Sequence, residues 1–464
     1  MLQNMSSHSK GFKKLNEWLC YLETLHNVEI DLGLTRIGQV AKKLNINFDF
    51  SRVITVAGTN GKGTTCAFLE NALLEETLDE QALTVAVYSS PHIERFNERL
   101  RINKVDVDDQ TFITAFEQIE QIRAEISLSY YEFTTLAAFI ILMKVKPKII
   151  ILEVGLGGRL DATNIIDADI GVITTIDLDH QAFLGNDREA IGFEKAGIFR
   201  ANQHIIIGDT NTPDSVIKYT QELNTSVNKD ITKEAQSNIK IREQDFTLLE
   251  QHKTKNEDLW KWQYTDLNSI NVNDITANKS LCLTSLVNTH IPKDNVATAL
   301  MVLHQLGVKL TTKKVNALIN KTKVTGRTEL FIKNETIACN VMLDVGHNPH
   351  AGRYLAKKVT ELKQQNKYQR IIAVVAMLAD KDIKNTLQPF QEIIDDWYIA
   401  KLTVPRAASI ELMAAELTNW TKSVNYFDNV TQAFKIASKN AKPNDLILVF
   451  GSFYTVAEIR QLLV

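Results

Sequence analysis

"TVAGTNGKGTTC" (residues 55–66) joins an apolar run to a helical pattern, and its interpretation decides the fold of the first half of the chain. Backbone N–H groups at a strand-to-helix turn, together with a lysine, bind phosphate oxygens. The spacing departs from the common GxxxxGK[ST] pattern, because Gly58 and Gly61 are three residues apart and Gly63 directly follows the lysine. We predict a shortened phosphate-binding loop, with a plain glycine turn as the alternative. Its residues are Gly58, Thr59, Asn60, Gly61, Lys62, Gly63 and Thr64.

Short apolar runs alternate with longer helical patterns along the chain. They include "RVITVAG", "KIIILEVG" and "IGVITTID" in the first half, and "NVMLDVG", "RIIAVVAML" and "DLILVFGS" in the second. This rhythm predicts buried parallel strands with helical crossovers, and therefore an α/β fold. We expect an N-terminal P-loop ATPase domain with a mainly parallel sheet (residues 1–322) and a C-terminal Rossmann-like α/β domain (residues 323–464).

The region from about 209 to 290 has a different composition. It is polar, rich in Asn, Thr and Lys, and contains "LWKWQY". These features favour a loop-rich or hairpin insertion in the first domain over another crossover unit. A hinge is expected at residues 320–329, where a helical pattern ends before Gly326.

The overall composition limits the classes of function. The chain has 464 residues, of which 44% are hydrophobic and 23% charged, and a formal net charge of -3, which fits a globular protein of more than one domain. No basic footprint for nucleic acid or an anionic membrane is expected. The four cysteines form no CxxC pair, and the N-terminus lacks a signal-peptide pattern. We therefore expect a cytoplasmic protein without nucleic-acid or membrane partners.

Two candidate metal ligands follow predicted strands. "YSSPH" (residues 88–92) ends one strand, where Ser89 or Ser90 could ligate a metal, although such a segment is more often only a turn. Glu153 ends the run "KIIIL" and precedes a glycine-rich loop, the place where Mg²⁺ needs an anionic oxygen ligand. The alternative is a capping or salt-bridged glutamate, but burying an unpaired charge there would be costly.

The stretch at residues 174–200 adds a histidine and a lysine. A lone histidine is more often a hydrogen-bonded structural residue, but the strand end at His180 favours a functional role. Lys195 lies in a fairly apolar helical stretch, where desolvation would lower its pKa and make the neutral amine reactive. An ion pair between Lys195 and Glu194 is the alternative.

Polar groups also stand at predicted strand ends and helix starts in the second half. "DVGHNPHAG" is the most suggestive, because Asp344, His347 and an amide cluster between a strand and a helix with Pro349 in its first turn. Asn295 and Arg327 are weaker signals when taken alone.

Together these motifs resemble those of the Mur ligase superfamily, and within it the folylpolyglutamate synthases, including the bacterial bifunctional dihydrofolate/folylpolyglutamate synthases. The resemblance covers nearly the whole chain, through "VAGTNGKGTTC", "SSPHIERFNERLRI", "EVGLGGRLDATN", "LDHQAFLGNDREAIGFEKAGIFR", "GRTEL" and "LDVGHNPHAG". It implies that ATP phosphorylates a carboxylate of a folate-type substrate and that the amine of L-glutamate attacks the acyl phosphate. Mg²⁺ and a carbamate on Lys195 are the implied cofactors.

The resemblance also implies roles for individual residues. The catalytic residues would be Lys62, Lys195 and His347. ATP would be bound by the loop at 58–64 with Asn295, Arg327, Asp344 and His347, and metal by Ser90, Glu153, His180 and Lys195. The pterin would be bound by Tyr130, Tyr131, Glu132, Phe133, Leu160 and Asp161. Aromatic residues at helical spacing are, however, more often part of a core. The candidates for glutamate binding are Asp380, Lys381 and Ser409.

The leading hypothesis is an ATP-dependent amide ligase that adds L-glutamate to dihydropteroate and to reduced folates. A monofunctional folylpolyglutamate synthase is the alternative, because the pterin-binding residues are loosely defined. A muramyl peptide ligase fits "DLGLTRI" and "SSPHIERF" less well. From a different class, a P-loop ATPase without ligase activity would turn over ATP and form no ligated product. We expect a monomer, because two joined domains already form a complete cleft.

Overall fold

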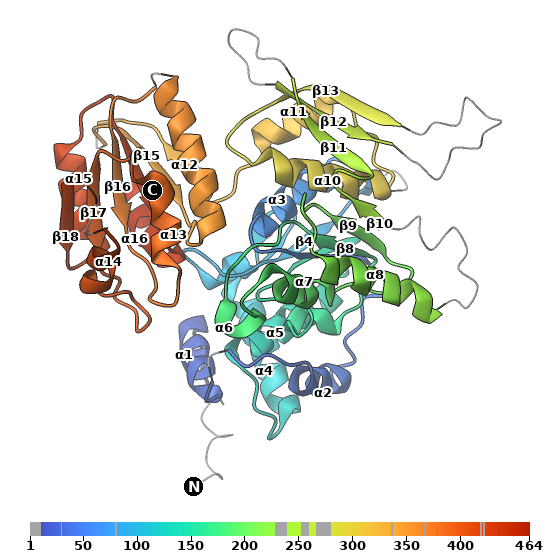
Figure 1. Cartoon of the computed structure of the whole chain (residues 1–464). Helices are drawn as coiled ribbons and strands as arrows, with labels where there is room; N and C mark the ends of the chain where they lie inside the picture. Colours follow the sequence, from blue (N-terminus) through green and yellow to red (C-terminus); the bar gives the residue numbers. More distant parts are fainter. Residues whose placement is uncertain are drawn as a thin grey trace. The chain divides into compact units, whose positions relative to one another are not determined.

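The structure is a computed structural model of the chain. It describes residues 11–464 except 29, 79–80, 228–238, 252–258, 266–279, 336, 366, 418–419 and 421–422. The chain divides into two compact units (Figure 1). The N-terminal unit comprises Met1–Ile176 and Arg188–Thr322, and the C-terminal unit comprises Asp177–Asp187 and Lys323–Val464. The segment Asp177–Asp187, which lies in the first half of the sequence, thus groups with the second unit.

The N-terminal unit is built on an eight-stranded sheet of order β10-β9-β8-β1-β7-β4-β5-β6. The strands are β1 (Arg52–Ala57), β4 (Val85–Tyr88), β5 (Leu100–Ile102), β6 (Val105–Asp106), β7 (Ile149–Glu153), β8 (Ile170–Ile173), β9 (His204–Ile207) and β10 (Ile239–Ile241). All neighbours pair in parallel except β4-β5 and β5-β6. The predicted mainly parallel sheet is confirmed. Val56 of β1 pairs with Glu153 of β7 and with Val172 of β8, so these three strands end together.

Helices cover both faces of this sheet. Neighbouring residues of β1 face opposite cores: Val53 packs with Trp18 and Phe116 in one hydrophobic cluster, whereas Ile54 packs with Phe68 and Leu300 in the other. The first face carries α1 (Leu15–Leu25), α2 (Thr35–Lys43), α4 (Asp109–Arg123) and α5 (Tyr130–Val145), and the second carries α3 (Lys62–Leu73), α10 (Lys293–Gln305) and α11 (Thr312–Lys321). In the described part of the chain, no helix has the length and apolar character needed to cross a membrane.

The region from 209 to 290 combines two kinds of structure. α8 (Asp214–Val227) connects β9 to β10, and these strands pair in parallel, so this part is a further crossover unit and the expectation against one is wrong. The remainder contains a three-stranded antiparallel sheet of β11 (Phe246–Glu250), β12 (Leu259–Tyr264) and β13 (Leu281–Val287), as the hairpin prediction expected. Trp262 of β12 is buried and donates to the Ala297 carbonyl on α10 (3.1 Å). Parts of the predicted insertion lie outside the described residues.

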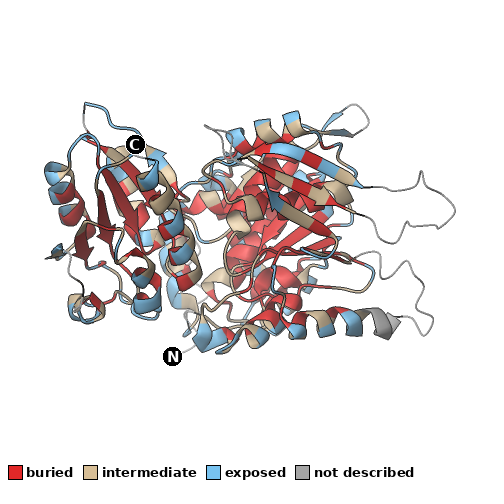
Figure 2. Ribbon diagram, turned by 45° about the horizontal axis from the view of Figure 1, so that its top comes forward, coloured by how far each residue is buried: buried red, intermediate tan, exposed pale blue. Residues whose placement is uncertain are grey.

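The C-terminal unit contains a six-stranded sheet of order β14-β15-β19-β16-β17-β18. The strands are β14 (Glu329–Phe331), β15 (Asn340–Asp344), β16 (Ile371–Val375), β17 (Asp396–Ala400), β18 (Ser423–Phe427) and β19 (Leu446–Phe450). β14 is antiparallel to β15, and the other pairs are parallel. Its helices are α6 (Gln181–Leu184), α12 (Pro349–Gln364), α13 (Ile383–Leu387), α14 (Ile410–Leu417), α15 (Val430–Asn440) and α16 (Phe453–Leu463). The central strands β16 and β19 are buried throughout, which is typical of a Rossmann-like sheet covered on both faces (Figure 2).

Two helical glycines give opposite expectations for the same substitution. A Cβ on Gly352 of α12 would lie 2.3 Å from the Thr386 carbonyl oxygen, whereas a Cβ on Gly38 of α2 would meet no atom within 4 Å. We expect Gly352→Ala to destabilise the protein by about 2 kcal/mol or more, because a backbone atom must move. Gly38→Ala should stabilise it by up to about 1 kcal/mol through helix propensity. Urea denaturation of both variants tests the pair, and equal effects would contradict the packing described for α12.

Candidate active site

The predicted phosphate-binding loop connects β1 to α3. Gly58 and Gly61 have φ values of 150° and 88°, and Gly61 is the N-cap of α3. This cap has no side chain to bond the first N–H groups of the helix, and such a helix start is a place where anions bind. The Lys62 ammonium folds back over the loop and donates to the Gly58 carbonyl (2.8 Å) and the Thr59 carbonyl (3.4 Å). This geometry is that of a glycine-containing turn with a positive charge at the start of a helix.

Two threonines that follow β8 hold the loop, and the sequence analysis did not identify them. The Thr174 hydroxyl donates to the Asn60 carbonyl (2.6 Å), and the Thr175 hydroxyl donates to the same oxygen (3.1 Å). The Thr175 carbonyl accepts from Thr59 N (2.8 Å). A Cβ on Gly58 would lie 1.9 Å from Thr174 Oγ1, so this contact requires glycine. The sequence signal was the pair of threonines directly after an apolar run.

Asn295 reaches the same loop from α10. It is buried, and a Cβ on Gly61 would lie 2.3 Å from its Oδ1 atom. The structure therefore brings the predicted ATP-binding residue Asn295 together with the phosphate-binding loop.

Glu153 ends β7 next to the start of α3. Its side chain is buried, and its two carboxylate oxygens would lie 3.7 and 3.8 Å from a Cβ on Gly63. The register between β1 and β7 explains this position, because Val56 pairs with Glu153 just before the loop begins. An acidic oxygen donor thus lies beside the phosphate-binding loop, where a hard divalent cation would bind.

Asp161 organises the glycine-rich loop that follows Glu153. One of its carboxylate oxygens accepts from Gly155 N (3.0 Å) and Leu156 N (2.9 Å), and the other accepts from Thr163 N (3.0 Å) and Thr163 Oγ1 (2.7 Å). Burial raises the pKa of this carboxyl, and the hydrogen bonds partly offset that rise. Both oxygens are therefore engaged within the loop itself, which gives the predicted pterin-binding residue Asp161 a structural role.

Lys195 lies near the end of α7 (Arg188–Ala196), and its side chain is buried. Arg159 of the glycine-rich loop forms an ion pair with Glu194 (2.7 Å), and its backbone N–H donates to the Glu194 carbonyl (2.7 Å). A Cβ on Gly158 would lie 2.9 Å from the Lys195 carbonyl. The Glu194 carboxylate thus pairs with Arg159, while close packing of the loop fixes the backbone that carries Lys195.

The Ser89–His92 turn follows β4. The Arg99 carbonyl accepts from Ser89 N (2.8 Å), and Arg99 Nε donates to His92 Nδ1 (2.9 Å). Burial, and then the charge of Arg99, lower the pKa of His92 to about 4. His92 is therefore neutral at physiological pH and accepts a hydrogen bond, which holds the turn that contains the predicted metal ligand Ser90.

The predicted pterin-binding residues at the start of α5 have different environments. Phe133 is fully buried and packs against Phe116 (5.6 Å between ring centroids) in the core, which fits the core alternative. Glu132 is buried and accepts from Ser129 N (2.8 Å), so it closes the N-terminus of the helix. Tyr130 lies under the Arg99 guanidinium (5.5 Å).

Tyr131 of α5 lies beside the glycine-rich loop. Its ring stacks on Tyr88 (6.3 Å), and a Cβ on Gly155 would lie 2.8 Å from its hydroxyl. That hydroxyl is buried, and burial raises its pKa well above the usual value. Leu160 is partly exposed in the same loop. Tyr131, Leu160 and Asp161 are thus associated with one loop, whereas Phe133 belongs to the core.

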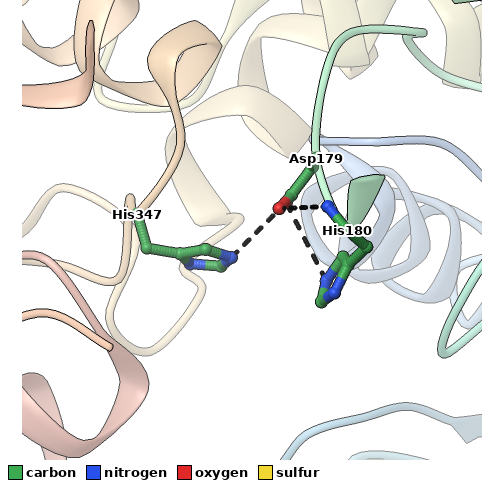
Figure 3. Close-up of side chains that lie close together, drawn as sticks. All are labelled: Asp179, His180 and His347. Atoms are coloured by element: carbon green, nitrogen blue, oxygen red, sulfur yellow. Dashed lines mark hydrogen bonds and ion pairs between the residues drawn. The ribbon is translucent and has the colours of Figure 1, made fainter. Parts of the chain in front are cut away.

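A second group of polar residues lies within the C-terminal unit, around Asp179 (Figure 3). The Asp179 carboxylate accepts from Lys381 Nζ (2.8 Å) and Asn348 Nδ2 (2.9 Å), and His347 Nε2 lies 3.6 Å away. His180 Nε2 lies 3.9 Å from Asp179 and 3.5 Å from Lys381 Nζ. Asp179, His180 and His347 have the spacing of a metal-binding group, but Lys381 supplies a positive charge at this place.

The charge of Asp179 follows from its neighbours. Burial raises the pKa of this carboxyl, but the hydrogen bond and charge of His347, with the charges of His180 and Lys381, hold it well below its usual range. Asp179 is therefore ionised. His180, His347 and Lys381 were predicted from separate stretches of the sequence, and the structure brings these three residues together.

The remaining predicted residues of the C-terminal unit form separate contacts. Asp344 is buried and accepts from Thr328 N (2.8 Å) and Gly346 N (2.7 Å), and burial raises its pKa. The Arg327 guanidinium lies over Phe453 (5.1 Å). Asp380 pairs with Arg406 (2.9 Å) at the surface. Ser409 accepts from Leu412 N (3.2 Å) at the start of α14.

Two protein-family models match this chain and define the class of protein to which it belongs. Residues 56–273 match the Mur ligase middle domain, and residues 326–453 match the Mur ligase glutamate ligase domain. The chain is 39% identical over 464 residues to the dihydrofolate synthase/folylpolyglutamate synthase of Haemophilus influenzae, covering 97% of each chain. It is 37% identical to the Escherichia coli protein of the same name, covering 97% of this chain and 95% of that one. The chain belongs to the dihydrofolate synthase/folylpolyglutamate synthase family.

Solved structures of this family have the same fold. E. coli FolC in complex with DHPP and ADP has a TM-score of 0.82 and 38% identity, covering 97% of both chains. A bifunctional folylpolyglutamate synthase/dihydrofolate synthase with Mn, AMPPNP and L-glutamate bound has a TM-score of 0.80 and 38% identity, covering 97% of this chain and 98% of that one. These complexes contain nucleotide, a divalent metal and an amino acid.

The threonine support of the loop gives a testable prediction. Thr174→Val removes the hydrogen bond to the Asn60 carbonyl with little change of shape, and we expect roughly tenfold weaker binding of ADP in calorimetric titration. Thr55→Val is the matched control, because the Thr55 hydroxyl is buried in β1 and has no hydrogen-bond partner among the residues that the structure describes. The control should bind ADP normally and be as stable as the wild type or more so. Equal affinity in all three proteins would refute a role of Thr174 in shaping the loop.

His92 should contribute to the pH dependence of stability. Its folded pKa of about 4 lies below the ordinary value of 6.5, so the unfolded chain binds the extra proton between these values and stability falls as the pH decreases. Between pH 7 and pH 5, we expect the free energy of unfolding of His92→Gln to fall by about 1–2 kcal/mol less than that of the wild type. Urea denaturation at the two pH values measures this difference, and parallel losses would contradict a buried neutral His92.

Proposed function

We propose that this protein is an ATP-dependent ligase that adds L-glutamate to dihydropteroate and to reduced folates. The terminal phosphoryl group of ATP is transferred to a carboxylate of the folate-type substrate, and the glutamate amine displaces phosphate from the acyl phosphate. The relatives that match along the whole chain are named as bifunctional enzymes, which favours both acceptors over a monofunctional folylpolyglutamate synthase. We assign the reaction to the cytoplasm, where isolated thiols such as those of this chain remain reduced.

The observation that carries the proposal is the position of Glu153 beside the phosphate-binding loop. Phosphoryl transfer between two anions needs charge neutralisation, which a divalent metal and a lysine supply. The buried carboxylate of Glu153 next to Gly63 fits such a metal, because a hard divalent cation prefers anionic oxygen ligands and the site lies beside the phosphate-binding loop. We propose Glu153 and Ser90 as metal ligands. Lys62, which spans the loop, would move its ammonium onto the γ-phosphoryl oxygens as they become more negative.

Lys195 is proposed as the site of a carbamate. Its side chain is buried, and a carbamate forms when a neutral lysine amine takes up CO₂. The carbamate would exchange a cation for an anionic oxygen donor, the kind of ligand a hard metal prefers. The packing of Gly158 against the backbone of Lys195 would keep this group in one orientation.

The C-terminal unit supplies the remaining proposed roles. Arg327 would bind nucleotide phosphate, with Asp344 and His347 near the ribose and phosphates. Asp344 already orders the backbone at Thr328 and Gly346, so it would position this region rather than donate a proton. Lys381 is the strongest candidate for binding glutamate, because its buried ammonium already holds a carboxylate, that of Asp179. Asp380, an anion at the surface, and Ser409, a neutral hydroxyl at the start of α14, are supported less, because a cation suits the carboxylates of glutamate better.

The activity is tested by phosphate release from Mg-ATP with L-glutamate, with dihydropteroate or tetrahydrofolate as acceptor and products identified by mass. We expect turnover of both acceptors. Turnover of tetrahydrofolate alone would identify a monofunctional chain-extending enzyme. ATP hydrolysis without a ligated product would identify a P-loop ATPase and overturn the proposal.

The carbamate predicts a specific loss and rescue. Lys195→Ala should lower kcat for ligation by at least about 100-fold, and short carboxylates added to the assay should restore part of it, because they replace the missing oxygen donor. Lys240→Ala is the matched control, since Lys240 is equally buried but lies on β10, against the Tyr264 ring (5.5 Å). A fully active Lys195→Ala protein would exclude the carbamate.

A further inference from the structure

The segment Asp177–Asp187 carries Asp179 and His180, and its two ends are held together by side chains outside the proposed site. It follows Ile176, three residues beyond the end of β8, and it ends where Arg188 begins α7. Ile176 is buried and lies beyond the end of β8, so its backbone N–H and C=O groups cannot form hydrogen bonds within the sheet. They need other hydrogen-bond partners.

Arg188 and Asp209 supply those partners. Asp209 Oδ2 accepts from Ile176 N (2.7 Å), and Arg188 Nε donates to the Ile176 carbonyl (2.9 Å). Arg188 Nη2 also donates to Asp209 Oδ1 (2.9 Å) and to the Asn211 carbonyl (2.8 Å). The Asp209 carboxylate further accepts from Asn211 N (2.9 Å). Arg188 and Asp209 thus form an ion pair that closes the base of the segment.

These bonds are strong by the usual criteria. Asp209 is almost fully buried and Arg188 about two-thirds buried, so their charge-assisted hydrogen bonds are shielded from water. The planar guanidinium donates in several directions at once, which an ammonium cannot do from one position. Removing either partner leaves a buried charge and a buried Ile176 backbone group without partners.

The same two residues also fix the start of α7. Lys195 lies seven residues after Arg188 on this helix, so the orientation of Arg188 sets the direction from which the helix begins. One ion pair thus connects the end of β8, the residues that follow β9, the base of the His180 segment and the helix of Lys195.

We propose that Arg188 and Asp209 are positioning residues for ligation: they fix the base of the Asp177–Asp187 segment at Ile176 and Arg188, and they fix the start of α7 and thereby the orientation of Lys195. The inference rests on the proposed function, because it assigns these two residues to the metal-dependent step. Neither Arg188 nor Asp209 contacts substrate in this account. Their effect is on the position of Lys195, and errors of about 1 Å in the position of a catalytic group can cost 100-fold in rate.

The test compares Asp209→Asn and Arg188→Lys with the wild-type full-length protein. In Asp209→Asn we expect faster hydrogen exchange of the backbone amides of residues 177–187, a kcat for ligation lower by at least about tenfold and a higher Mg²⁺ concentration for half-maximal rate. Arg188→Lys keeps the charge but not the fork of donors, so all three measurements should fall between those of the wild type and Asp209→Asn. It also keeps the test decisive if Asp209→Asn folds poorly.

Asp445→Asn is the matched control. Asp445 is buried, pairs with Arg370 (2.7 Å) and accepts from Lys442 N (2.7 Å), but it lies just before β19, at the opposite end of a strand from the loops that follow it. It should lose stability as Asp209→Asn does while keeping the wild-type kcat and Mg²⁺ dependence. If Asp209→Asn and Asp445→Asn have the same kcat and Mg²⁺ dependence, or if exchange in residues 177–187 is unchanged, the inference is overturned while the proposed function stands. A wild-type protein that forms no ligated product overturns the proposed function itself.

Discussion

The parallel register of three strands is the constraint on which the site in the N-terminal unit depends. Val56 of β1 pairs with both Glu153 and Val172, so the residues that follow β1, β7 and β8 emerge at the same edge of the sheet. The phosphate-binding loop, the acidic residue and the two supporting threonines are therefore neighbours. A shift of one residue would turn each side chain to the opposite face, which the two hydrophobic cores prevent.

The features that the sequence predicted correctly are those with local causes. A strand of β-branched residues, a glycine-rich turn and an amphipathic helix each have a pattern within about ten residues. Most of the parallel strands of both sheets, the phosphate-binding loop and the helix that starts at Pro349 were predicted for this reason. The crossover through α8 was missed because its polar composition hid the helical period in a region where "LWKWQY" indicated a hairpin.

The features that the sequence did not reveal depend on distant partners. Thr174 is 114 residues from Asn60, the residue whose carbonyl it binds, and only the pairing of β1 with β8 brings the two together. The hydrogen bonds of Asp161 within its own loop and the core position of Phe133 also depend on the tertiary fold. Packing decides whether such a side chain faces the core, a neighbouring loop or a ligand. Residue type at these positions allows several roles, and burial selects one of them.

The contact between Gly58 and Thr174 links two positions that are far apart in sequence. A side chain at Gly58 would occupy the place of the Thr174 hydroxyl, so the two positions cannot vary independently. Alanine at residue 58 would meet two separate obstacles, the Thr174 hydroxyl and a backbone φ of 150° that side chains rarely adopt. Loss of the oxygen at residue 174 would remove only the first of them. Residue 174 can therefore change without freeing residue 58, whereas any change at residue 58 disturbs residue 174, so the dependence between the two positions runs in one direction.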